Sequence, residues 1–324
     1  MSNRVCDVLG VKYPVIQGAM AWNSMPQLVS AVSNAGGLGV LGSGPMPADI
    51  ARDNINQIKD MTDKPFAFNV FMDPGQHLEE VLEATVGLKA PVVYLDTLNL
   101  LEYEFTKKHY DMFHAEGTKV VAKVNCLQDA IIAEQAGADV IITKGMTGGG
   151  HKTKIDTSIL LLEAVKHVKI PVVASGGIAT PEQMAGYIMM GAEGIEMGCA
   201  FIATEEANAH INYKNGIVAA CDLDPVYVGD CTGEASWQLH NRKADKLIEI
   251  EASYPRAEAA PLFKQLAAGS GRIAAQTGDV QEKGSIMCGQ AAALVDSIVP
   301  VRERIEGMCR RCEEILKAGA TLGL

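Results

Sequence analysis

Length, composition and charge exclude several classes of protein. The chain has 324 residues, of which 48% are hydrophobic, and a formal net charge of −11, so it can build one large α/β barrel or two ordinary domains and does not suit nucleic-acid binding through a basic surface. It has no apolar run long enough for a membrane span and no signal-peptide pattern at its start, and its eight scattered cysteines are typical of reduced thiols, so we expect a cytoplasmic protein.

Short apolar runs alternate with helix-like segments through the first two thirds of the chain. The apolar runs are 13–17, 38–42, 66–71, 91–96, 119–124, 139–143, 171–175 and 194–198. The helix-like segments between them are 25–36, 47–61, 77–88, 98–116, 127–137, 157–168 and 181–191. Valine- and isoleucine-rich strands that alternate with helices form parallel sheets, and eight such units predict a closed (β/α)8 TIM barrel.

The alternation stops after the eighth run. Residues 205–284 mix polar, aromatic and apolar stretches, and we interpret them as a helical insertion that forms a lid over the barrel mouth. The stretch from 284 onward predicts two helices interrupted near Pro300, the first packed on the barrel. The predicted organisation is therefore a barrel of residues 1–204 and 285–324 with a lid of residues 205–284.

Glycines follow the seventh and eighth predicted strands. Barrels of this kind bind phosphate with the loops after these two strands, which are residues 175–183 and 197–206 here. Gly176 and Gly177 expose backbone amides in the first loop, and Gly198 and Cys199 offer a second pair. These loops predict a cradle for one phosphate monoester.

Three phosphate-bearing ligands fit that prediction: a sugar phosphate, pyridoxal phosphate or FMN. Pyridoxal phosphate needs a lysine for a Schiff base, and Lys123 and Lys144 lie near strand ends. FMN needs backbone and amide groups near its ring, which residues 17–20 and Asn69 are placed to supply. The residues alone leave these alternatives open.

The stretch GMTGGGH places His151 after the sixth predicted strand. A histidine titrates near pH ~6.5 and can give or take a proton at neutral pH. Gly149 and Gly150 let the backbone approach a flat cofactor ring closely, so we expect them to bind the cofactor. His240 lies in the predicted lid, where it can meet substrate. No HExxH motif or clustered Cys/His spacing indicates a metal site.

The chain resembles the FMN-dependent barrel family that contains nitronate monooxygenases (2-nitropropane dioxygenases) and enoyl-acyl-carrier-protein reductase II. The matching stretches keep the family order over nearly the whole chain: YPVIQGAMAW, AVSNAGGLGVLGSG, TDKPFAFNV, GMTGGGH, PVVASGGIAT, GAEGIEMGCAFIATEEANAHINYK and GSIMCGQAAALV. MAW at 20–22 and GSIMCGQ are closer to the reductase branch.

The resemblance implies FMN as the cofactor. Its ring would be held by Ala19, Met20 and Asn69, and its phosphate by the amides of Gly176, Gly177, Gly198 and Cys199. His151 would be the catalytic residue. In the reductase branch NAD(P)H reduces the flavin, which then gives hydride to an enoyl thioester. In the monooxygenase branch the histidine takes the α-proton of a nitroalkane before reaction with oxygen.

Several positions depart from the family pattern on the side expected to meet substrate. Lys144 and Thr147 stand where the family usually has Glu, and Cys199 where it usually has Thr. Trp237 stands where reductase relatives tend to have Arg, and a tryptophan stacks or packs instead of binding an anion. We expect Trp22, Trp237 and His240 on the substrate side.

Four functions follow from these observations. The leading one is an FMN-dependent, NAD(P)H-using reductase of an activated C=C bond in a small-molecule or acyl-thioester substrate. A nitronate monooxygenase is the alternative within the family. A flavin-binding sensor without turnover and a phosphate-handling isomerase are the others. We expect no nucleic-acid or membrane partner. We expect a homodimer, because homodimers are the commonest oligomers of soluble proteins.

Overall fold

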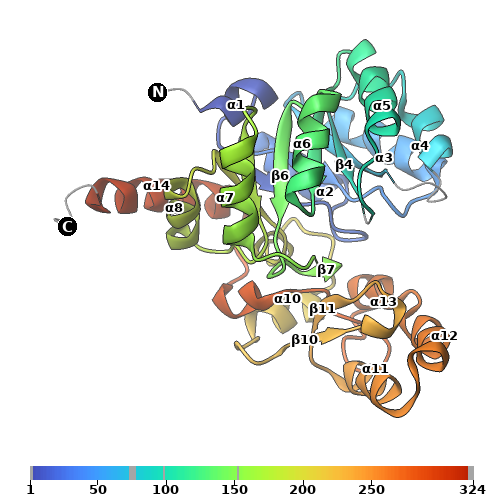
Figure 1. The fold of residues 1–324 in the computed structure, drawn as a ribbon. Helices are drawn as coiled ribbons and strands as arrows, with labels where there is room; N and C mark the ends of the chain where they lie inside the picture. The colour runs from blue at the N-terminus through green and yellow to red at the C-terminus, as the bar shows by residue number, and fades with distance from the viewer. Residues whose placement is uncertain (1–2, 73–77, 98, 152, 320–324) are drawn as a thin grey trace.

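Eight parallel strands form a barrel, which occupies the upper part of the view in Figure 1. The computed structural model describes residues 3–72, 78–97, 99–151 and 153–319, and of His151 it describes the backbone alone. The sheet order is β1-β9-β8-β6-β5-β4-β3-β2, and a parallel bridge between Ile16 and Leu38 joins its two edges. The predicted TIM barrel is therefore confirmed. Its strands are β1 (Val15–Gln17), β2 (Gly39–Leu41), β3 (Phe66–Phe71), β4 (Val92–Asp96), β5 (Lys119–Val124), β6 (Val140–Lys144), β8 (Val172–Ser175) and β9 (Gly194–Met197).

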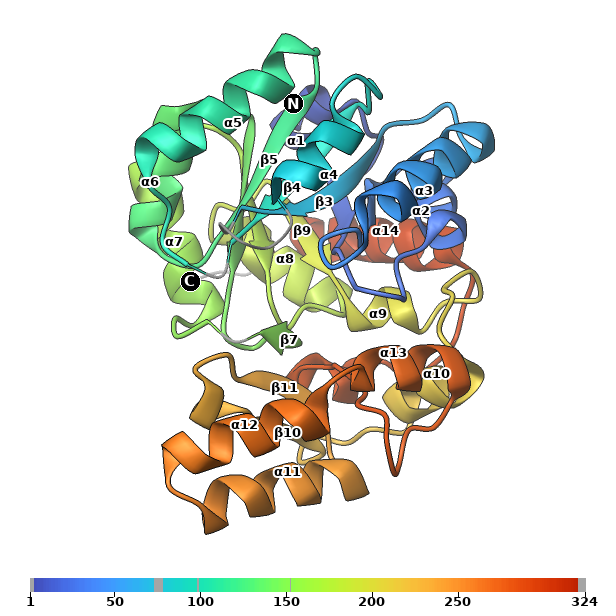
Figure 2. The same ribbon diagram turned by 90° about the vertical axis from the view of Figure 1, so that its right-hand side faces the viewer.

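Helices between successive strands cover the outside of the barrel. They are α2 (Pro26–Asn34), α3 (Ala48–Met61), α4 (Leu78–Thr85), α5 (Tyr103–Ala115), α6 (Leu127–Ala136), α7 (Thr157–His167) and α8 (Pro181–Met189). Each falls within its predicted segment, although residues 77 and 98, which begin two of those segments, lie outside the described residues. The last helix, α14 (Val301–Gly319), packs against α8 and α2 and completes the helical layer (Figures 1 and 2).

Strand alternation divides the core into two apolar layers. Residues such as Val92, Val121 and Val173 point into the barrel, whereas their neighbours Val93, Val120 and Val172 face the helices. The short helix α1 (Arg4–Leu9) adds Val5 and Leu9 to the inner layer and closes the end of the barrel opposite the lid (Figure 1). The interior is thus a packed core and not a channel.

The lid, residues 205–284, lies across the other end of the barrel (Figures 1 and 2). It is not wholly helical as predicted, because it contains two strands, and alternating apolar and polar residues such as Trp237, Gln238 and Leu239 favour a strand that is half buried. Its elements are α10 (Ile211–Val218), β10 (Pro225–Val228), a 3-10 turn (Asp230–Thr232), β11 (Ser236–Leu239), α11 (Arg242–Ser253), α12 (Arg256–Ala267) and α13 (Ser270–Thr277). A four-residue helix, α9 (Cys199–Ile202), precedes it.

A strand from the barrel completes the sheet of the lid. β7 (Gly150–His151) follows β6 and pairs antiparallel with β11, with His151 opposite Ser236 and Gly150 opposite Trp237. The order of the small sheet is β10-β11-β7. The lid is therefore hydrogen-bonded to the loop that carries the predicted catalytic histidine.

The C-terminal region corrects a second expectation. The first of the two predicted helices is absent from the described residues: residues 285–289, named the return segment here, carry no helix and lead into a 3-10 turn, Gln290–Leu294. Close packing explains this, because a Cβ on Gly289 would lie 2.4 Å from the carbonyl oxygen of Thr147. The return segment runs in contact with the loop after β6, and the second predicted helix forms as α14.

Candidate active site

Polar side chains replace apolar ones where the inward-facing rows of the barrel reach the lid. Tyr94 in β4, Val121 in β5 and Ile142 in β6 point inward. In each of these strands the residue two positions later carries a charged side chain. Because strand side chains alternate with period two, these residues also point inward, and they line one cavity. We name this group the polar floor: Asp96, Lys123, Lys144, Ser175 and Glu196.

Glu196 is the centre of the polar floor. It accepts hydrogen bonds from Lys123 Nζ at 2.7 Å, from Ser175 Oγ at 2.6 Å and from the Tyr94 hydroxyl. Burial raises the pKa of Glu196, but the opposing Lys123 ammonium and the two hydroxyls outweigh burial and hold that pKa below its ordinary value. Glu196 is therefore an ionised, fully partnered carboxylate that fixes the floor in place.

Lys144 ends β6 beside this network. Burial lowers its pKa, Asp96 opposes that change, and the neighbouring Lys123 ammonium adds to it. The side chain lines the cavity. The floor therefore presents a second lysine whose amine is more readily deprotonated than an exposed one.

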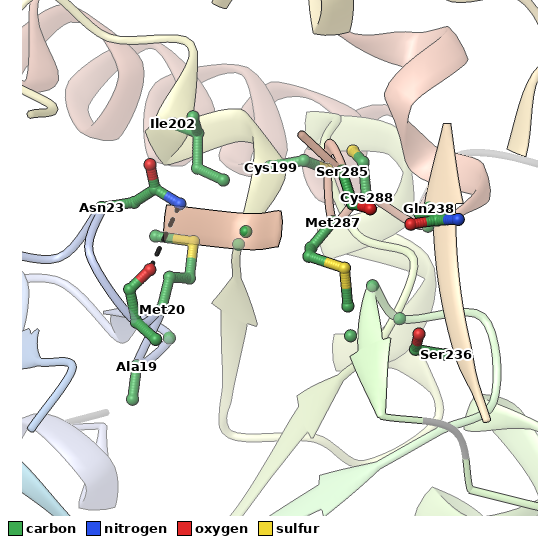
Figure 3. A pocket seen from close by; sticks show the side chains of 18 of the residues that line it. Ala19, Met20, Asn23, Cys199, Ile202, Ser236, Gln238, Ser285, Met287 and Cys288 are labelled. Carbon is green, nitrogen blue, oxygen red and sulfur yellow. Dashed lines mark hydrogen bonds between the residues drawn. The ribbon is translucent and has the colours of Figure 1, made fainter. Parts of the chain in front are cut away.

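The cavity continues from the floor to the lid and has a volume of about 670 Å³. That size falls in the range of roughly 300–1,000 Å³ usual for ligand sites. Figure 3 shows Ala19, Met20, Asn23 and Ile202 on one side and Ser236, Gln238, Ser285 and Met287 on the other. The wall thus combines barrel loops, the lid and the return segment.

Both predicted phosphate loops contribute to this wall. Gly176 has a φ of 115° and Gly177 a φ of 71°, a backbone conformation that side chains disfavour. Thr147 is tied to this loop, because its hydroxyl bonds that of Thr157 at 2.9 Å, which in turn donates to the Gly176 carbonyl at 3.1 Å. The Thr147 hydroxyl therefore supports the loop after β8. Gly198 and Cys199 line the same cavity.

The residues expected around a flavin ring also line the cavity. They are Ala19 and Met20, which follow β1, and Asn69 in β3. The Met20 amide donates to Ser24 Oγ at 3.1 Å, so it is already engaged. Ser43 Oγ donates to the Asn69 carbonyl at 2.6 Å and holds this part of β3. A ring at this place would meet the Met20 thioether and the Asn69 amide.

The two glycines before His151 have different surroundings. A Cβ on Gly149 would lie 2.9 Å from the amide nitrogen of Gly289, so Gly149 packs against the return segment. Gly150 has a φ of 75°, and a Cβ there would meet no atom within 4 Å. Gly150 also lines the cavity. For His151, whose side chain is not described, the structure gives the backbone position in β7.

Of the three residues expected on the substrate side, only Trp22 lines the cavity. It has a φ of 67°, and the Arg272 guanidinium of α13 stacks on its ring at 4.7 Å. Trp237 lies on the other face of β11, where its Nε1 donates to the Met146 carbonyl at 2.9 Å. His240 is exposed and bonds Asp245 at 2.7 Å. The structure therefore leaves Trp237 and His240 outside the cavity, because alternation along β11 and the start of α11 direct them elsewhere.

Sequence reasoning missed most of the polar floor. The sequence does not single out Asp96, Ser175 or Glu196, and it indicates Lys123 only as a candidate for a Schiff base and Lys144 as such a candidate and as a departure from the family pattern. The signal was present, since each of them lies two residues after an inward-facing position of its strand.

Neither a metal cluster nor a membrane-spanning helix is present in the part of the chain that the structure describes. Within the described ranges, no group of three or more His, Cys, Asp or Glu side chains gathers as metal ligands would. Among the same residues, no helix has the length and apolar character needed to cross a membrane.

The fold and site define a class: a TIM-barrel oxidoreductase with a large cavity at the carboxyl ends of its strands, lined by glycine loops that would suit a phosphate-bearing flavin. The nitronate monooxygenase family model matches residues 2–311, and the chain belongs to that family, whose members are FMN-dependent oxidoreductases.

Comparisons with individual proteins agree with this assignment. A probable nitronate monooxygenase of Staphylococcus saprophyticus is 29% identical, with 98% of this chain and 99% of the relative covered. FabK from Thermotoga maritima is 35% identical and superimposes with a TM-score of 0.90 over 99% of both chains. Nitroalkane oxidase from Streptomyces ansochromogenes is 25% identical, with a TM-score of 0.80 over 97% of this chain and 99% of its own.

Proposed function

We propose that this chain uses NAD(P)H and bound FMN to reduce the C=C bond of an activated enoyl thioester. The main support is the lid side of the cavity, where Val228, Leu247 and Phe263 supply an apolar wall above the polar floor. An acyl chain buries its methylene groups against such a wall, whereas a small nitroalkane has little apolar surface to bury. The 35% identity to FabK, an enoyl-acyl-carrier-protein reductase II, supports the same choice.

In the proposed reductase, each group of cavity residues has a separate role. The amides of Gly176, Gly177, Gly198 and Cys199 hold the phosphate of FMN, and Ala19, Met20, Asn69, Gly149 and Gly150 surround its ring. When bound, FMN supplies two-electron transfer between the nicotinamide and the substrate. The His151 imidazole delivers the proton that the α-carbon of the thioester takes up. The lid excludes water, and Trp22 borders the substrate.

A nitronate monooxygenase is the second candidate. The family match over residues 2–311 and the Staphylococcus saprophyticus relative favour it. In this case the His151 imidazole takes the α-proton from the nitroalkane, oxygen is the second substrate, and NAD(P)H has no part.

An anaerobic assay separates the two functions. We expect NADH or NADPH to bleach the flavin absorbance of the holoenzyme without oxygen, and a crotonyl thioester to restore it. Oxygen uptake with a nitronate, together with flavin that NAD(P)H leaves oxidised, would instead establish the monooxygenase.

Replacement of His151 tests the proton-transfer role. We expect His151→Ala to keep its FMN and to lose turnover by roughly 10²–10⁴-fold, the usual contribution of a positioned acid or base. His240→Ala is the matched control, because His240 is exposed and bonded to Asp245. Equal turnover in the two variants would remove His151 from the mechanism.

A further inference from the structure

Two cysteine side chains from distant parts of the chain meet in the wall of the cavity. Cys199 follows β9 and begins α9, whereas Cys288 belongs to the return segment. Both line the cavity, and each thiol is the neighbour that shifts the pKa of the other most. Figure 3 shows the pair at the edge of the pocket, between Ile202 and Gln238. Cavity access and mutual contact are the two conditions for chemistry between thiols.

The two thiols differ in their surroundings. The neighbouring Cys288 thiol, with the backbone amides of Cys199 and Ala200, lowers the pKa of Cys199 although burial opposes it. The neighbouring Cys199 thiol, with burial, raises the pKa of Cys288. Cys199 is therefore the thiol that more readily becomes a nucleophilic thiolate, and Cys288 holds its proton beside it.

We propose that Cys199 and Cys288 are a reversible oxidation site, a peroxide-sensitive dithiol in the wall of the active-site cavity. The Cys199 thiolate attacks hydrogen peroxide, the O–O bond breaks, and Cys199 sulfenic acid and hydroxide form. The sulfur of Cys288 then attacks the sulfenic sulfur, an S–S bond replaces the S–O bond, and water leaves. In total, two thiols and one peroxide give one disulfide and two waters.

The disulfide would covalently join two segments that lie far apart in the sequence. One is the loop after β9, where we expect the phosphate of the cofactor. The other is the return segment, which connects the lid to α14. Oxidation would therefore fasten the lid to the barrel beside the cofactor. This inference does not depend on which substrate the enzyme reduces.

The test uses the FMN-loaded Cys221→Ser variant, because Cys221 is the exposed thiol most open to unrelated oxidation. Peroxide at a small molar excess should lower the number of thiols alkylated after unfolding from seven to five, and dithiothreitol should restore all seven. Peptide mapping without reductant should show one cross-linked pair that contains residues 199 and 288.

Two further variants test the order of the steps. In a Cys288→Ser background we expect Cys199 sulfenic acid to persist and to be captured by dimedone. In a Cys199→Ser background Cys288 should stay reduced at the same peroxide concentration. Cys199→Thr replaces Cys199→Ser if the serine variant loses FMN or its native circular dichroism spectrum.

Cys309 and Cys312 of α14 provide the internal control. They lie one helical turn apart and are buried, and burial raises the pKa of Cys309 to about 12. We expect Cys199 to be oxidised at least about tenfold faster than Cys309, since one pKa unit changes the thiolate fraction tenfold. Full alkylation of residues 199 and 288 after peroxide, or equal oxidation of the α14 pair, would overturn the proposal.

Discussion

At the scale of single residues, the polar floor depends on the pair of Lys123 and Glu196. Both side chains are nearly buried, at 10% and 5% exposure, and their charged atoms lie 2.7 Å apart. Breaking such a pair from one side leaves a buried charge without its partner, whereas replacing both removes the charge altogether. The pair therefore fixes the floor without adding much stability over an uncharged substitute.

We expect Lys123→Met to lower the free energy of unfolding by roughly 3–5 kcal/mol at pH 7, and the double variant Lys123→Met/Glu196→Gln to lower it less. The measurement is urea unfolding followed by circular dichroism. A double variant that is less stable than Lys123→Met would contradict the account of the pair.

The same pair predicts a pH dependence. In the native protein the pKa of Glu196 is held below the unfolded value, so its contribution to stability is present above that value and is lost as pH falls through the folded pKa. In Lys123→Met the ammonium that lowers the pKa of Glu196 is gone, so burial raises that pKa in the folded state above the unfolded value. Ionised Glu196 then destabilises the folded protein instead of stabilising it. We expect the stability difference between the two proteins to shrink on acidification from pH 7 toward pH 4, as measured by urea unfolding at each pH.

At the scale of elements, β7 and the return segment decide the shape of the cavity. Gly150 has open space beside it, so Gly150→Ala should cost only the backbone strain of a positive φ, about 1–2 kcal/mol, while adding a methyl group to a residue that lines the cavity. Gly87 is the matched control, since its φ is 86° and a Cβ there also meets no atom within 4 Å, but it lies at the opposite end of the barrel.

We therefore expect Gly150→Ala and Gly87→Ala to be destabilised alike in urea, and only Gly150→Ala to lose turnover. Gly289→Ala should be destabilised more than either, because its Cβ would lie 2.4 Å from the Thr147 carbonyl oxygen. Equal turnover in the first two variants would mean that β7 does not border the reacting groups.

The barrel elements were predictable from sequence, whereas the lid and the return segment were less so. β3 and β5 coincide with the apolar runs 66–71 and 119–124, because strands buried on both faces are continuously apolar. β7 has two residues and exists only through its pairing with β11, so no local pattern could indicate it. The apolar residues of the return segment are compatible with a helix. Its conformation is instead set by close backbone contacts with the loop after β6, which is distant in sequence.

Sequence reasoning brought together most of the candidate site but not its floor. Glycine loops at strand ends carry a local signal, and those residues line the cavity. Glu196 lies in a run that is otherwise apolar, and its partners Tyr94, Lys123 and Ser175 come from three other strands. Such a cluster becomes visible only when the strand register is known.

At the scale of the whole molecule, the cofactor should stabilise barrel and lid together, because the cavity is lined by both. At an FMN concentration of 100 times Kd, binding adds about 2.7 kcal/mol to the free energy of unfolding. For a chain of this size we expect removal of FMN to lower the Tm by about 5 °C or more, as measured by differential scanning calorimetry.

Riboflavin serves as the control for this measurement. It lacks the phosphate that the loops after β8 and β9 are expected to hold, so it should restore less of the lost Tm than FMN at equal concentration. Equal restoration by both compounds would contradict the phosphate cradle.

The pairing of β7 with β11 also bears on the order in which the molecule is made. All eight barrel strands lie before residue 198, so the barrel can close while the lid is still being synthesised. β7 gains its hydrogen-bonding partner only when residues 236–237 emerge, and Gly149 gains its backbone neighbour only with Gly289. The loop that carries His151 therefore reaches its final form only once Gly289 has been made, after the scaffold that supports it.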